Sequence, residues 1–165
     1  MRIAFPAALA YELSESDGPL EPPAHATDWP EIALLDGGVE RGDSAALAIP
    51  RSRLYAMHGL AEGWAAAWSA TRGQGLALAF DVGWFAHCWV WHENRVSGGV
   101  WRGAAEMLVV EPATVPHSLG LSVAEAAGHA RTIEPGVVAE PWIVVRPVNG
   151  VAPVSSVGRD GRLQR

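Results

Sequence analysis

A carboxylate and a run of tryptophans carry the strongest chemical signal in this chain. Eight of its 165 residues are Trp, and three of them, Trp84, Trp89 and Trp91, fall within ten residues, with Trp101 close behind. An indole ring has a flat apolar face and one N–H donor, which suits stacking on the C–H face of a pyranose. The pattern predicts a sugar-binding surface, and the alternative is that the tryptophans form the core.

Strand alternation decides which of these side chains act together. If residues 87–91 form a strand, His87, Trp89 and Trp91 share one face, and Cys88 and Val90 point the other way. We therefore expect His87, Trp89, Trp91 and Trp101 to contact a ligand, with Arg102 or His87 donating to its hydroxyls.

Glu111 is the candidate catalytic residue. In the expected strand Ala105–Glu111, this carboxylate ends a face that is otherwise apolar, and Pro112 is expected to stop the strand. A carboxyl in a partly desolvated site can serve as a general acid or base. The alternative is a strand-end carboxylate in solvent or paired with an Arg.

The elements that must position these residues are short strands separated by Gly, Pro and Asp. Turn signals every 8–12 residues predict an antiparallel β-sandwich, a mainly β fold with one short helix. Ser122, Glu125 and Gly128 predict that helix at Val123–Ala127, through a capping box and a C-terminal glycine. Glu134-Pro135-Gly136 predicts a turn. The expected strands are Arg2–Leu13, Leu47–Pro50, Leu54–Met57, Trp64–Ala70, Gly75–Asp81, His87–Trp91, Ala105–Glu111, His129–Ile133 and Val137–Val148. The alternative for the Ala-rich stretch Glu62–Trp68 is a helical turn.

Several of these segments, in this order, resemble the C-terminal half of the aldose 1-epimerase (galactose mutarotase-like) superfamily. The resemblance covers roughly residues 30–148. It is carried by His58–Trp64, the aromatic strand His87–Trp91, Trp101-Arg102-Gly103, Glu111-Pro112-Ala113-Thr114, and Gly128–Ile133 with the turn that follows.

The resemblance implies part of a mutarotase-like β-sandwich that binds a free aldose and needs no cofactor. Glu111 stands at the position of the family base, which takes the proton of the anomeric hydroxyl. The acid histidines of the family lie in its N-terminal portion, and His58, His87 and His92 do not match those motifs. The alternatives are a non-catalytic sugar-binding module and a truncated structural remnant. Half a sandwich would leave an apolar face and strand edges uncovered, so we expect a homo-oligomer or a second subunit that completes it.

The composition of the chain bears on its partners, its location and its domain organisation. The net charge is −6, and all 12 basic residues are Arg, without a basic cluster, which argues against nucleic acid and anionic membrane as partners. A single cysteine, Cys88, no signal peptide and no long apolar run favour the cytoplasm. A zinc site is not expected, because alternation separates His87 from Cys88 and His92. We expect one domain over residues 1–150 and a flexible tail over 151–165.

Overall fold

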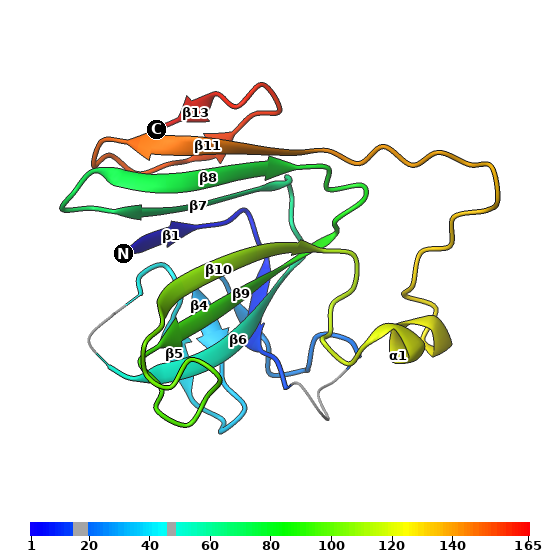
Figure 1. Cartoon of the computed structure of the whole chain (residues 1–165), viewed down its shortest axis with the longest axis horizontal. Coiled ribbons are helices and arrows are strands. Elements are labelled where there is room, and N and C mark those ends of the chain that lie inside the picture. The colour runs from blue at the N-terminus through cyan, green and yellow to red at the C-terminus, as the bar shows by residue number, and fades with distance from the viewer. Residues whose placement is uncertain (15–19, 46–48) are drawn as a thin grey trace.

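Most of the regular structure is β. The computed structural model describes residues 1–14, 20–45 and 49–165 (Figure 1). Its strands form a four-stranded sheet, a seven-stranded sheet and a two-stranded hairpin, accompanied by one helix of six residues. The expected mainly β class, a sandwich-like fold with one short helix, is confirmed.

The four-stranded sheet is antiparallel throughout, in the order β1-β7-β8-β11. Alanine dominates β7, and small side chains let other layers approach both faces of the sheet. The strands are β1 (Arg2–Ala4), β7 (Trp64–Ser69), β8 (Gln74–Phe80) and β11 (Ile143–Asn149).

The seven-stranded sheet has the order β10-β9-β6-β2-β4-β5, and β3 pairs with β2 beside this path. Only β2 and β4 run parallel. The strands are β2 (Leu9–Glu12), β3 (Thr27–Asp28), β4 (Glu31–Ala33), β5 (Val39–Arg41), β6 (Arg51–His58), β9 (His87–Asn94) and β10 (Glu106–Ala113).

Two apolar clusters hold the layers together. Between the sheets, Ile3, Ala65 and Phe80 of the smaller sheet pack with Met57 and Val90 of the larger one. On the outer face of the smaller sheet, a second cluster includes Trp64, Trp68, Ala77, Val148, Val154, Val157 and Leu163. The last three belong to the C-terminal segment, where β12 (Ser156–Val157) and β13 (Leu163–Gln164) form a hairpin. This differs from the expected flexible tail.

Several expected strands differ from the structure. Arg2–Leu13 is divided, because Pro6 interrupts it and its two halves join different sheets. His129–Ile133 forms no strand, and β11 begins only at Ile143, so most of the expected strand Val137–Val148 is irregular. Residues 47 and 48 of the expected strand Leu47–Pro50 lie outside the described residues, and Ile49 and Pro50 are not in a strand.

Pro112 does not end its strand as expected. It lies inside β10, opposite Cys88, and β10 continues to Ala113. Because β10 is an edge strand, a residue whose amide would face outward loses no ladder bond when it is proline.

Helix α1 (Leu121–Ala126) is close to its expected position, but its start is different. Its N-cap is Gly120 and no side chain caps it, so the capping box of Ser122 and Glu125 is not formed. The expected C-terminal glycine is confirmed, since Gly128 has φ +74° and its N–H donates to the Glu125 carbonyl. The turn at Glu134–Val137 is also confirmed by a backbone hydrogen bond of 3.0 Å.

Within the described residues, no helix has the length and apolar character needed to cross a bilayer.

Candidate functional site

Strand register places Glu111 beside the aromatic strand. Glu111 lies opposite Trp89, which in turn lies opposite Ala56, so these three side chains share one face of the seven-stranded sheet. This face points away from the smaller sheet, and we call it the outer face. His87 is on the same face, diagonal to Glu111, and diagonal neighbours on adjacent strands are about 7–8 Å apart.

Histidines from four segments meet at this end of the outer face. The rings of His58 on β6 and His87 on β9 have centroids 5.0 Å apart. The rings of His117 and His129, which flank α1, are 5.5 Å apart. Glu21 accepts a hydrogen bond of 2.9 Å from Nε2 of His129. We call His58, His87, His117 and His129 the histidine group.

A covering segment, residues 114–130, brings two of these histidines onto the sheet. Tyr11 Oη and Trp89 Nε1 donate to the carbonyls of Pro116 and Val115, at 3.5 and 3.2 Å. Ser118 Oγ donates to the Ser14 carbonyl at 3.2 Å. These contacts attach the segment to β2 and β9, so the position of His117 follows from the sheet beneath it.

Burial favours the neutral form of three members of the histidine group, His58, His87 and His117. Burial lowers the pKa of His58, His87 and His117, and for His87 the value falls to about 4, with a further contribution from the nearby charge of His58. His117 is 1% exposed, and its Nδ1 accepts the Leu119 N–H at 3.3 Å, which leaves the proton on Nε2.

Several nitrogens of this group are buried and have no hydrogen-bond partner among the residues that the structure describes. They are Nδ1 of His58, Nδ1 of His87, Nε2 of His117 and Nδ1 of His129. Buried polar atoms are normally satisfied, so each of these nitrogens calls for a water molecule or another partner.

The other expected site residues are spread along β9 and the loop after it. Trp91 is half-buried on the outer face, and its Nε1 donates to Ser52 Oγ at 3.3 Å. Trp101 and Arg102 are exposed in the loop between β9 and β10. That loop follows Asn94, which is five residues or about 17 Å along the strand from Trp89. The structure therefore brings His87, Trp89 and Glu111 together and leaves Trp101 and Arg102 apart from them.

Sequence reasoning did not identify Glu21, His117 and His129 as site residues. All three lie outside strands, in segments whose positions depend on tertiary contacts. The one available signal was residue type. Of the six histidines in the chain, all except His25 are partly or fully buried.

Metal binding has no geometric support in the part of the chain that the structure describes. Across residues 1–14, 20–45 and 49–165, no three His, Cys, Asp or Glu side chains gather closely enough to hold an ion.

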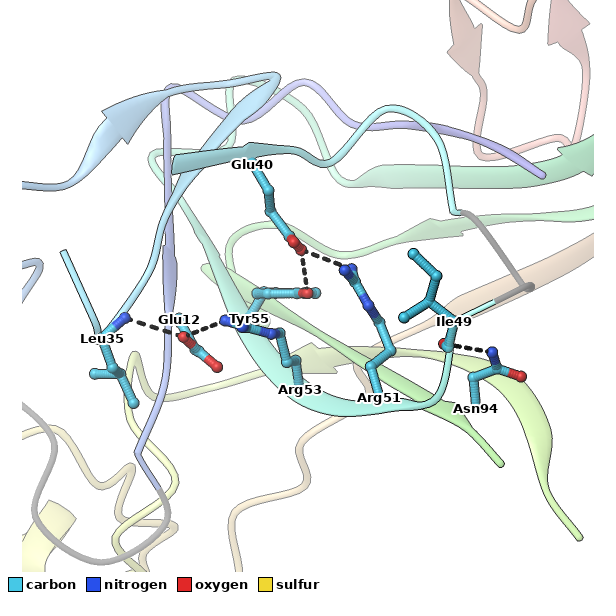
Figure 2. A network of polar contacts seen from close by, with 8 residues as sticks. All are labelled: Glu12, Leu35, Glu40, Ile49, Arg51, Arg53, Tyr55 and Asn94. Atoms are coloured by element: carbon cyan, nitrogen blue, oxygen red, sulfur yellow. Dashed lines mark hydrogen bonds and ion pairs between the residues drawn. The ribbon is translucent and has the colours of Figure 1, made fainter. Parts of the chain in front are cut away.

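A second polar cluster lies on the opposite, inner face of the seven-stranded sheet (Figure 2). The Glu40 carboxylate accepts hydrogen bonds from the Tyr55 hydroxyl and, at 3.0 Å, from Arg51. Glu12 accepts hydrogen bonds from Arg53 at 2.8 Å and from the Leu35 N–H at 3.0 Å. We call these five side chains and the Leu35 amide the paired network. It borders a cavity of about 20 Å³, which is room for a single water molecule.

Comparisons with known proteins add no assignment. The chain matches no protein-family model, no curated protein and no solved structure.

Proposed function

We propose that the outer face of the seven-stranded sheet binds a free aldose and that Glu111 promotes exchange between its anomers. The observation that carries the proposal is the register that sets Glu111, Trp89 and His87 on one face, with His58 beside His87. An aromatic surface, a carboxylate and the half-buried imidazole of His87 match the apolar face and the hydroxyl groups of a pyranose.

The chemistry requires one base and one acid. Glu111 would take the proton of the anomeric hydroxyl while the ring oxygen takes a proton from the imidazolium form of His87. The bond between the ring oxygen and the anomeric carbon breaks, the carbonyl carbon rotates, and the ring closes as both protons return. Because burial lowers the pKa of His87 to about 4, the imidazolium is a small fraction at pH 7. Catalysed exchange should therefore accelerate as the pH falls towards 5.

A second candidate is a sugar-binding module without catalysis. It is favoured by the neutral state of His58, His87 and His117, since a neutral imidazole binds hydroxyl groups well but is a weak acid. A cytoplasmic location belongs to either proposal, and the buried free thiol of Cys88 supports a reducing compartment.

The test is proton NMR of a panel of aldoses with the purified chain, recording saturation transfer and anomeric exchange together. We expect both signals, with exchange reduced at least tenfold in Glu111→Gln and unchanged in Glu106→Gln. Glu106 is the matched control, because it lies on the same strand but belongs to the opposite face and pairs with Arg95.

Saturation transfer without exchange would favour the binding module. Full exchange in Glu111→Gln would contradict the role of Glu111, and the absence of both signals with every aldose would contradict sugar binding itself.

A further inference from the structure

The covering segment is attached to the rest of the molecule by few buried side chains. It follows β10 and forms α1, and Figure 1 shows a long irregular connection from there to β11. Among residues 114–130, only Pro116, His117 and Ala124 are buried. A segment with so few buried contacts opens at a lower free-energy cost than the sheet beneath it.

The largest of these buried side chains is a histidine. His117 is 1% exposed, and its Nδ1 accepts a hydrogen bond from the Leu119 N–H at 3.3 Å. Only a neutral imidazole can accept this bond, because both ring nitrogens of an imidazolium carry a proton. Protonation would therefore set a second N–H against the Leu119 N–H. The closed position of the covering segment thus requires neutral His117.

Neighbouring positive groups strengthen this requirement. The ring of His129 lies 5.5 Å from that of His117, and His58 and His87 form the other close pair of rings on the sheet. A positive charge on one of these rings disfavours charge on the others. Burial, and to a lesser extent the charge of His129, lowers the pKa of His117. Arg131, which follows the segment directly, adds a permanent positive charge.

The carboxylates around the histidine group act in the opposite direction, but weakly. Glu21 is bonded to His129 at 2.9 Å, and protonation of His129 would strengthen that pair. The Glu21 side chain is 68% exposed, however, so water screens the interaction. Glu111 is on the same face of the sheet, on β10, and Glu125 is the one acidic residue of the segment and is exposed. Burial raises the pKa of Tyr11 to about 12, so its hydroxyl stays neutral.

We propose that the covering segment is a lid that opens on acidification, released by protonation of His117. In the open form His117 meets water and regains the ordinary histidine pKa of about 6.5. The closed form is therefore favoured most above pH 6.5. Below that pH the open form binds one more proton, and the equilibrium constant for opening rises by up to about tenfold per pH unit.

Opening would change the outer face of the seven-stranded sheet. It separates the Val115 carbonyl from Trp89 Nε1, which donates to it at 3.2 Å in the closed form, and it uncovers the surface around that indole. The idea that the uncovered surface receives a sugar rests on the proposed function, whereas the opening itself does not.

The test is hydrogen–deuterium exchange of the full chain by NMR, without ligand, at pH 7.5 and pH 5, corrected for the intrinsic pH dependence of exchange. The probes are the amides of Ala124 and Ala127, whose hydrogen bonds form the helical turn of the lid. We expect their opening constant to rise at least tenfold at pH 5. At both pH values it should exceed the opening constant of the β9 amides, which report the sheet.

Two variants and a control assign the effect to His117. His117→Leu supplies an apolar side chain that cannot be protonated, and it should reduce the rise at least threefold. His117→Gln also lacks a titrating group and keeps the test available if the leucine variant is unstable. His25→Gln, a change at an exposed histidine, is the matched control and should show the wild-type rise.

Three outcomes would overturn the proposal. The first is an opening constant that is the same at pH 7.5 and pH 5. The second is a rise in both His117 variants as large as in the wild type. The third is exchange of the Ala124 amide only together with the β9 amides, because the segment would then have no opening of its own. No sugar enters this experiment, so its failure is distinguishable from a failure of the proposed function.

Discussion

Two polar groups on opposite faces of the seven-stranded sheet, the paired network and the histidine group, differ in how their side chains are bonded. On the inner face, the paired network gives Glu12 and Glu40 two donors each. On the outer face, four histidines come together, and each has a buried nitrogen without a partner in the described part of the chain. A carboxylate that already has its donors stabilises the fold, although Nε of Arg51 in the paired network has no partner among the described residues. A buried imidazole nitrogen without a partner costs free energy until water or another group satisfies it.

The largest effect should come from breaking the paired network. Glu40→Ala leaves the Arg51 guanidinium and the Tyr55 hydroxyl without their shared acceptor in a half-buried position. We expect a loss of about 2–4 kcal/mol in the free energy of unfolding, measured by urea denaturation. Tyr55→Phe, which removes one donor and leaves the ion pair, should cost about 1 kcal/mol. Equal effects of the two variants would show that the ion pair adds nothing.

The next effect concerns pH and the histidine group. The pKa of His87 is about 4 in the folded protein, below the ordinary value of 6.5. Between these values the unfolded chain binds more protons, so stability is complete above pH 6.5 and falls as the pH drops towards 4. From pH 7.5 to pH 5, His87 should contribute a loss of roughly 1–2 kcal/mol.

His87→Gln should flatten this dependence, and His25→Gln, a change at an exposed histidine, should leave it as in the wild type. The measurement is the urea midpoint at both pH values. An unchanged slope in His87→Gln would place the acid sensitivity elsewhere.

A smaller effect is expected when a member of the histidine group is replaced. His117→Leu loses the hydrogen bond from the Leu119 N–H but no longer buries an unpaired Nε2–H. These changes oppose each other, so the free energy of unfolding at pH 7.5 should change by less than about 1 kcal/mol. Thermal unfolding of this variant beside Glu40→Ala tests the contrast directly. A loss as large as that of Glu40→Ala would mean that His117 has a partner in solution.

The smallest effect on stability is expected for an exposed ion pair. Asp160 pairs with Arg162 at 3.3 Å, but their side chains are 59% and 89% exposed. Asp160→Asn should change the free energy of unfolding by less than about 0.5 kcal/mol, because water screens such a pair. A larger change in the urea midpoint would indicate that the hairpin turn, and not the ion pair, depends on Asp160.

The sequence predicted local features better than long-range ones. Turn signals marked β8, β9 and β10, and alternation placed His87, Trp89 and Trp91 on one face, because period-2 patterning is a property of the strand itself. For β7 the Ala-rich sequence left a strand and a helical turn open, and the structure shows a strand. Alternation predicts nothing about which strands pair or where the segments outside the strands lie. The meeting of His58 with His87 depends on pairing between β6 and β9, and that of His117 with His129 depends on the covering segment.

Two errors have the same physical origin. Pro112 was expected to stop a strand, but an edge position requires no amide donor, and edge status is set by the order of strands in the sheet. The C-terminal segment was expected to be flexible because it is polar and contains glycine, yet Val154 and Val157 are buried against another sheet. Neither the edge position of Pro112 nor the burial of Val154 and Val157 follows from the neighbouring residues in the sequence.

The C-terminal hairpin has a consequence for biosynthesis. Trp64 and Trp68 are 5% exposed in the finished protein, and their cover includes Val154, Val157 and Leu163. During translation, β7 leaves the ribosome about 90 residues before that cover, which corresponds to several seconds at 5–20 residues per second. Over that interval two indole rings on the outer face of the smaller sheet are without part of their packing. The nascent chain is thus a better substrate for chaperones than the completed one.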